Sequence, residues 1–265
     1  MTTAVKDEAP ATGAAACSPE EWKLRVELAA CYRVFAYLGW IEMIFNHITM
    51  RVPGPEHHFL INPFGLHYTE VTASNLVKID LDGNILGHSA YPVNPAGFVI
   101  HSAIHAASAD ALCIVHTHTT AGMAVSCSKR GLVANNFYGS AVLDKIAYHD
   151  FEGPAVDDAE KPRLVRDLGN KRALILRNHG LLCHGKTIAE AFDLHYRLQR
   201  ACEVQLATSN IDEGIMIPES VRERSRNIVL DAGRLKMDAP PPPSPQKLFD
   251  AMVRIIDRID PSYKN

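Results

Sequence analysis

The sequence predicts an α/β fold in which helices flank a mixed, mainly antiparallel sheet. Two observations support this prediction. The strand-like segments are short and several end at turn sequences such as Pro53-Gly54 and Asp82-Gly83, which are typical of hairpins. Helical patterns stand before, between and after these segments instead of alternating with them, so a regular βαβ repeat is excluded. The chain has 265 residues, enough for one sizeable core, and we place the domain at residues 19–238.

Capping signals define the first and the longest helix. Ser18 can cap a helix that has Pro19 at its first position, and apolar residues at helical spacing continue to Leu38, before Gly39. Thr187, with Glu190 three residues later, predicts the start of a helix that extends to residue 208. Shorter helices are expected over residues 98–107 and 161–168.

Strands are expected between these helices. A buried strand over residues 111–117 is followed later by two strands that flank the turn at Asn178-His179-Gly180. The strand after Asp82-Gly83 is a possible hairpin return at residues 84–86. The other expected strands cover residues 48–52, 59–61, 77–81, 173–176 and 181–183, and residues 132–136 and 141–148 are weaker candidates for strand or helix.

Composition excludes several classes of protein. The formal net charge is −3, which does not suggest binding to nucleic acid or to a membrane surface. No apolar stretch approaches the roughly 18–20 residues of a membrane span, and residues 1–18 lack the pattern of a secretory signal, so we expect a disordered tail there. The six cysteines are scattered without a Cys-x-x-Cys motif, which favours a reducing, cytoplasmic setting.

The last part of the chain has its own pattern. Residues 239–245 hold five prolines in seven positions and predict an extended spacer. Residues 246–265 then contain a short amphipathic helix, which we expect to dock on its own or on a neighbouring subunit, the alternative being a partly ordered tail. Its predicted apolar face consists of Leu248, Met252, Ile255, Ile256 and Ile259.

Three histidines form the candidate metal site. His116 and His118 close a buried strand, and side chains two residues apart on a strand point to the same face. His179, in a distant turn, would supply a third imidazole. Three nitrogen ligands leave open coordination positions, which is the pattern of a catalytic rather than a structural metal. Gly180 would allow a left-handed turn and a close backbone approach beside His179.

These motifs resemble the class II aldolase/adducin family over roughly residues 21–203. Within the family the chain is most similar to the adducin head domain, without the long adducin tail. The resemblance rests on Asn46 before a strand that ends at Arg51, Ile61–Gly65, Val71–Ser74, His116-x-His118 and Asn178–Gly180, and, for the adducin head, on Leu60–Leu66, Glu70–Ser74, Ala96–Phe98, His101–Ile104, Ala147–Asp150, Leu176–Leu181 and Ala201–Gln205.

The resemblance implies a fold, a metal and an assembly. We expect a three-layer class II aldolase-like fold and a divalent cation on His116, His118 and His179. Zn²⁺ is favoured, with Mn²⁺, Fe²⁺ or Co²⁺ left open. Asn46 and Gly65 match residues of the substrate pocket. We also expect a homotetramer whose site lies between subunits and takes a small carbonyl substrate.

The chain departs from the aldolases at the position of their acid/base glutamate. That glutamate corresponds to Gly97, and two phosphate-binding serines correspond to Pro95 and Ala96. An aldolase tyrosine falls near Phe137, beside Tyr138. The catalytic acid or base is therefore not identified. Groups that could titrate near the site are His101, His105, Tyr138, His149 and His184, and Glu42 and Glu70 are weaker candidates for a fourth ligand, but for each of these a structural or surface role is favoured.

Two functions remain. The first is a metal-dependent lyase that acts on a small hydroxy- or keto-carbonyl compound, by aldol cleavage or decarboxylation through a metal-stabilised enolate. The compact length favours it. The second is a non-catalytic assembly module like the adducin head, and Gly97 favours that. Metal-dependent oxygen chemistry on an aromatic keto acid occurs among relatives, but no feature of this chain indicates it.

Overall fold

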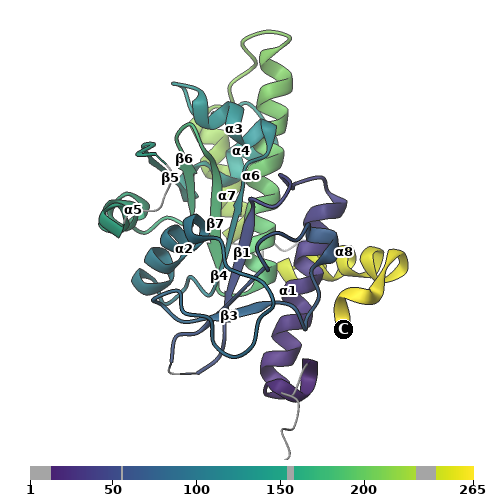
Figure 1. Ribbon diagram of the computed structural model, residues 1–265. Helices are drawn as coiled ribbons and strands as arrows, with labels where there is room; N and C mark the ends of the chain where they lie inside the picture. Colours follow the sequence, from purple (N-terminus) through teal and green to yellow (C-terminus); the bar gives the residue numbers. More distant parts are fainter. Residues whose placement is uncertain (1–12, 55, 154–157, 231–242) are drawn as a thin grey trace, which may run out of the picture.

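The computed structural model describes residues 13–54, 56–153, 158–230 and 243–265, and its centre is a sheet with helices on both faces (Figure 1). The strand order is β3-β2-β1-β4-β7-β6-β5. The strands are β1 (His47–Arg51), β2 (Phe59–Ile61), β3 (Val77–Ile79), β4 (Cys113–Thr117), β5 (Ile146–His149), β6 (Ala173–Leu176) and β7 (Gly180–Gly185).

The sheet is mixed and mainly antiparallel, as the sequence predicts. The β5–β6 pair is parallel, and the other neighbours in the described sheet are antiparallel. The register of the central strands matters for the site. His47 of β1 lies opposite His116 of β4, so the two side chains are neighbours on one face of the sheet.

Helices cover each face of the sheet (Figure 1). Ile48 and Val115 point toward α1, α6 and α8, whereas Ile114 and Leu182 point toward α2 and α5. The helices are α1 (Pro19–Tyr37), α2 (Pro95–Ala107), α3 (Thr120–Cys127), α4 (Phe137–Val142), α5 (Lys161–Leu168), α6 (Ile188–Ser209), α7 (Glu219–Leu230) and α8 (Pro245–Ile259).

The two predicted helix caps are present. Ser18 Oγ accepts a hydrogen bond from the backbone N–H of Glu21 at 3.1 Å, and Thr187 Oγ1 accepts one from Glu190 at the same distance. Each cap satisfies a backbone donor that the first turn leaves without a partner. The start positions of α1 and α6 are therefore encoded locally.

Other local predictions differ from the structure. Helices α3 and α7 are additional to those predicted, and residues 132–136 form neither helix nor strand. Residues 141–148 are divided among α4, a 3₁₀ turn at Leu143–Lys145 and β5. The hairpin return after Gly83 is reduced to one bridge between Ile79 and Ile85.

The terminal segments are described in part. Residues 1–12 of the predicted tail and 239–242 of the predicted spacer lie outside the described residues, and Gly13–Ala16 forms a short 3₁₀ helix. Helix α8 packs on α1 and α6 of its own chain. The ring centroids of Phe249 on α8 and Phe192 on α6 are 5.4 Å apart. Of the predicted apolar face, Ile256 is buried whereas Ile259 is exposed.

Among the described residues, no helix combines the length and the apolar character that crossing a membrane requires.

Candidate functional site

The structure brings His116, His118 and His179 together. His116 is the fourth residue of β4, His118 follows directly after that strand, and His179 lies in the turn between β6 and β7. The Nε2 atom of His118 is 2.7 Å from that of His116 and 3.0 Å from that of His179. The potential ligand atoms of the three rings all lie within 4.8 Å of one another.

Hydrogen bonds at the far side of two rings set their tautomers. His116 Nδ1 lies 3.0 Å from the carbonyl oxygen of Leu181, and His118 Nδ1 lies 2.7 Å from Oε2 of Glu42. Because both oxygens can only accept, each Nδ1 carries the proton and donates it. Each neutral ring therefore turns an Nε2 lone pair toward the centre of the cluster, as carboxylate–histidine–metal sites do.

Burial keeps these rings neutral. It lowers the pKa of His179 to about 4 and that of His116 well below the usual range. Burial also lowers the pKa of His118, although the carboxylate of Glu42 opposes it. Neutral imidazole is the form that binds a metal ion. Facing lone pairs cannot bond to one another, so this donor set fits a cation.

The turn that carries His179 is tight for two separate reasons. Asn178, rather than Gly180, adopts the left-handed conformation, with φ of 57°. A Cβ at Gly180 would lie 2.4 Å from the carbonyl oxygen of Thr117 and 3.2 Å from the His118 ring. The prediction for Gly180 is therefore right about the close approach and wrong about the left-handed turn.

The three histidines line a cavity of about 380 Å³. Its walls combine the cluster with apolar rings, so a small molecule could sit there largely away from water. The lining residues are Glu42, Phe45, His47, Phe64, Asn94, Ile100, His116, His118, Phe151, Gly153 and His179.

His47 occupies the space beside Gly97, where the related aldolases have a glutamate. A Cβ at Gly97, in the first turn of α2, would lie only 2.7 Å from Cδ2 of His47. A side chain at this position would therefore require the imidazole to move. The ring centroid of His47 is 4.9 Å from that of His116, and both residues line the cavity. Sequence analysis missed His47, because only the strand register places it beside His116.

Two of the other histidines considered from sequence connect to His47. His101 Nε2 lies 3.0 Å from His47 Nδ1, and both His101 and His105 contact Thr49 Oγ1 at 2.7 Å. The i, i+4 spacing of His101 and His105 on α2 was the signal for this pair.

The remaining candidates lie outside the cavity lining. His149 contacts Asp167 and Glu160, and His184 lies 3.1 Å from the carbonyl oxygen of Lys171. Tyr138 packs against the ring of Tyr196. These contacts give each of the three a structural role in the described fold.

Three of the predicted acidic and pocket residues have structural partners. Glu42 hydrogen-bonds His118 at Nδ1, on the side of the ring away from the cluster. Glu70 Oε2 accepts from the backbone N–H of its own 3₁₀ turn at His67. Asn46 is buried and holds the site from behind, since its Oδ1 accepts from the N–H of His118 at 3.0 Å and its Nδ2 donates to the Trp40 carbonyl at 3.3 Å.

Gly65 lies in the loop after β2 with φ of 105°, next to Phe64, which lines the cavity. A positive φ of this size favours glycine. The substrate-binding roles of Gly65 and Asn46 stay predictions.

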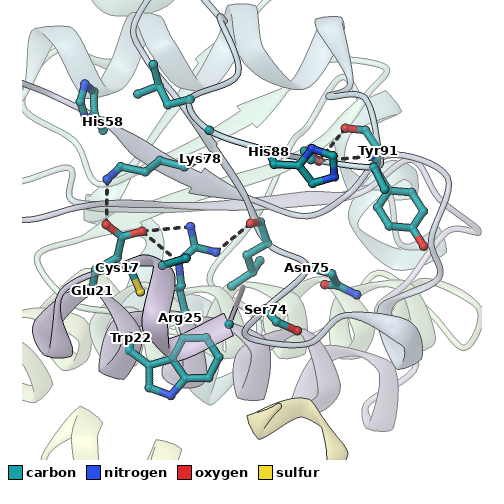
Figure 2. A pocket seen from close by; sticks show the side chains of 17 residues that line it. Cys17, Glu21, Trp22, Arg25, His58, Ser74, Asn75, Lys78, His88 and Tyr91 are labelled. Carbon is teal, nitrogen blue, oxygen red and sulfur yellow. Dashed lines mark hydrogen bonds and ion pairs between the residues drawn. The ribbon is translucent and has the colours of Figure 1, made fainter. Parts of the chain in front are cut away.

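A larger cavity, of about 590 Å³, lies between the start of α1 and the edge strand β3 (Figure 2). Its charged groups are already paired. Glu21 accepts from Arg25 Nε at 2.9 Å and from Lys78 Nζ at 2.7 Å, and Arg25 also donates to the carbonyl of Leu76. This network ties α1 to the sheet edge, so we assign it a structural role.

The family follows from this geometry and from comparison with known proteins. Residues 26–206 match the model of the class II aldolase and adducin N-terminal domain. The chain belongs to the class II aldolase/adducin family. Class II aldolases are typically dependent on a divalent metal, commonly Zn²⁺.

The relatives of this chain include proteins named as aldolases and proteins named as adducins. It is 46% identical over 256 residues to the "Putative aldolase class 2 protein" of Pseudomonas aeruginosa, covering 96% of this chain and 97% of that protein. It is 43% identical over 244 residues to alpha-adducin of Rattus norvegicus, covering 89% of this chain but only 33% of alpha-adducin. The structure of L-fuculose 1-phosphate aldolase from Glaciozyma antarctica superimposes with a TM-score of 0.78 at 29% identity, covering 98% of this chain and 97% of that one.

Proposed function

We propose that this protein is a metal-dependent carbon–carbon lyase that acts on a small hydroxy- or keto-carbonyl compound. The observation that carries the proposal is the convergence of three neutral imidazole nitrogens in a cavity of about 380 Å³. His116, His118 and His179 would hold the cation, with Zn²⁺ favoured and Mn²⁺, Fe²⁺ or Co²⁺ as alternatives. When bound, such a cation supplies Lewis-acid polarisation of a carbonyl oxygen.

The protein's own side chains would prepare the site. Leu181 and Glu42 hold the rings of His116 and His118 in the ligating tautomer. The rings of Phe45, Phe64 and Phe151 line the cavity and would contact a bound carbonyl compound.

Gly97 restricts the kinds of reaction that the site could catalyse. Aldol cleavage by the familiar route uses a glutamate at this position, and the His47 ring fills that space. Decarboxylation also breaks a carbon–carbon bond to give an enolate, and it does not need the glutamate to start. We therefore favour decarboxylation, or an aldol cleavage whose proton comes from another group.

The expected assembly is a cytoplasmic homotetramer with its sites between subunits. Phe45 and Phe151 line the cavity and yet are exposed, and Met43 beside them is 71% exposed. Apolar side chains at the mouth of a polar site are typical of a surface that another protein chain covers. Family members are oligomeric, which supports a partner subunit as this cover.

The test is metal content followed by a substrate panel. We expect about one metal ion per subunit by elemental analysis, and turnover of one or more hydroxy- or keto-acids or aldol-type sugars that stops on chelation and returns with metal. The His116→Ala/His118→Ala variant serves as the inactive control. Metal-independent turnover, or none across a broad panel by metal-loaded protein, would contradict the proposal.

The second candidate is a non-catalytic assembly module like the adducin head. Gly97 favours it, and the 43% identity to alpha-adducin is consistent with it. It predicts a stable oligomer with no turnover whether or not metal is bound, and the same panel therefore separates the two functions.

A further inference from the structure

We propose that Nε2 of His47 is a hydrogen-bond acceptor for a hydroxyl group of the substrate, and that Thr49, His101 and His105 position it by fixing its tautomer. The assumption that a metal-bound substrate occupies the cavity rests on the proposed function. The positioning of His47 does not, because it follows from contacts within the chain.

Four side chains form one buried line between β1 and α2. His47 and Thr49 are two residues apart on β1, and His101 and His105 are four apart on α2. Two residues of a strand and four of a helix both advance by about 6–7 Å, so the two pairs can face each other. His47 Nδ1 contacts His101 Nε2 at 3.0 Å, and Thr49 Oγ1 lies 2.7 Å from both His101 Nδ1 and His105 Nε2.

A backbone carbonyl fixes the far end of this line. His105 Nδ1 lies 2.6 Å from the carbonyl oxygen of Ala111. That oxygen can only accept, so Nδ1 of His105 carries a proton. The other nitrogen of a neutral ring, Nε2 of His105, is then an acceptor for the hydroxyl of Thr49.

The alternation of donor and acceptor continues from Thr49 through His101 to His47, at the cavity. The Thr49 hydroxyl has a single proton, which it donates to His105, so its oxygen accepts from Nδ1–H of His101. Nε2 of His101 then accepts from Nδ1–H of His47. His47 is left with an unprotonated Nε2.

This assignment holds while all three rings are neutral. All three rings are at most 3% exposed, which disfavours the charged imidazolium form, and burial lowers the pKa of His105 to about 3. For His105, the hydrogen bond to Ala111 raises the pKa and so opposes burial, whereas Arg51 and His184 lower the pKa further. At neutral pH the line therefore has one consistent set of donors and acceptors.

The free end of the line faces the candidate site. Nε2 of His47 has no hydrogen-bond partner among the described residues, and the ring lines the same cavity as the three clustered histidines. A lone pair there needs a donor. A hydroxyl next to a carbonyl or carboxylate group is the donor that the hydroxy compounds of the proposed substrate class offer, whereas keto and unsubstituted acids offer none.

The first experiment reads the tautomer directly in metal-free protein at pH 7.5. Ring-nitrogen NMR of ¹⁵N-histidine-labelled protein, with His47→Gln to assign the signals, should show His47 protonated at Nδ1 only. Thr49→Val, which removes the hydroxyl but keeps the branched shape, should give a mixture of both tautomers. Thr49→Ser, which keeps the hydroxyl, should restore the single tautomer.

The second experiment uses glycolate and acetate, which differ by one hydroxyl group, with zinc-loaded protein in titration calorimetry. In Thr49→Val the ratio of the two dissociation constants should shift by about twofold against glycolate, because an equal mixture of tautomers leaves half of the protein with an accepting Nε2. The ratio should be unchanged in Thr49→Ser. A ratio that is equal in all three proteins overturns the recognition of the hydroxyl.

The outcomes separate the two proposals. Protonation of His47 at Nε2, or a single Nδ1 tautomer that survives Thr49→Val, overturns the positioning role. If Thr49→Val does not fold, the wild-type tautomer and Thr49→Ser still decide this point. If the zinc-loaded protein binds neither acid, hydroxyl recognition fails together with the proposed function, while the tautomer of His47 is decided independently by NMR.

Discussion

Two groups of three histidines lie side by side in this protein, and they satisfy their ring nitrogens in opposite ways. In the cluster of His116, His118 and His179, the three Nε2 atoms approach one another, and the contact between His116 and His118 joins two acceptors with no donor. In the line of His47, His101 and His105, each contact joins a donor to an acceptor, with Thr49 as the connecting hydroxyl.

The difference shows what makes a histidine group a metal site. Both groups are largely buried and neutral, so neither burial nor pKa distinguishes them. The distinguishing property is the balance of protons, because the line has one for every contact and the contact between His116 Nε2 and His118 Nε2 has none. A cation can supply what the cluster lacks, and the predictions below test this contrast.

The largest expected effect is the loss of metal when the cluster is removed. His116→Ala/His118→Ala should bind less than about a tenth of the metal of the wild type, because one imidazole cannot hold a labile divalent ion. His105→Gln, which alters the line instead, should keep its metal. Elemental analysis of both gel-filtered proteins is the measurement, and equal metal content in the two variants would remove the distinction.

Acid should destabilise the fold, because buried histidines must stay neutral in it. The pKa of His47, His105 and His195 is about 3, below the unfolded value near 6.5, so unfolding takes up protons between these values. The stability that these neutral histidines contribute is complete above pH 6.5. As the pH falls toward 3, the free energy of unfolding decreases by about 1.4 kcal/mol per pH unit for each histidine.

Urea denaturation at pH 7.5, 6.5 and 5.5 measures this slope. His195 is the matched control outside both groups, since burial alone lowers its pKa. His195→Gln should make the slope shallower by the equivalent of about one proton. A free energy of unfolding that is constant across this range would mean that the histidines are not buried as described.

Glu42→Gln should weaken metal binding without abolishing it. The carboxylate accepts a hydrogen bond from His118 Nδ1–H and raises the basicity of the ring, and loss of such a partner typically costs 10–100-fold in affinity. Competition with a zinc indicator measures the dissociation constant. Glu70→Gln, at a glutamate outside the cluster, should leave the constant unchanged, and an equal effect of both variants would show that only net charge matters.

The smallest expected effect is that of Gly97→Ala, which acts where the line meets the cluster. The new methyl group would lie 2.7 Å from the His47 ring, so the ring or α2 must shift. Overpacking of this kind costs about 1–3 kcal/mol of stability. If His47 causes the clash, a smaller side chain there should remove most of the cost, so the His47→Ala/Gly97→Ala double variant should be more stable than additivity predicts. Chemical denaturation of the single and double variants measures the coupling.

Local signals predicted most of the fold. The caps at Ser18 and Thr187 and the pattern of hairpin strands are properties of neighbouring residues, and they define α1, α6 and the mixed sheet. Helix α3 was missed because residues 120–127 are apolar on all sides and contain Gly122. Helix α7 was missed for the opposite reason, because its sequence is mostly polar and has few apolar residues.

The residues of the candidate site also divide into those that the sequence indicates and those that only the structure shows. The motif His116-x-His118 and the turn at His179 are recognisable in sequence, and the structure brings these residues together. His47 and Thr49 are not recognisable, since their importance depends on the pairing of β1 with β4 and on the contact with α2. The glycine at position 97 signalled that a side chain was missing, but it could not show which ring filled the space.

The packing of α8 on α1 has a consequence for synthesis on the ribosome. Arg33 of α1 forms an ion pair with Asp260, and Phe249, Ile256 and Tyr263 complete the core over α1. These partners are made more than two hundred residues after α1. At about 5–20 residues per second, the part of α1 that α8 covers stays exposed for roughly 10–40 s during translation. Nascent chains of this protein are therefore most exposed to aggregation after the strands that carry the candidate site have been made and before α8 emerges.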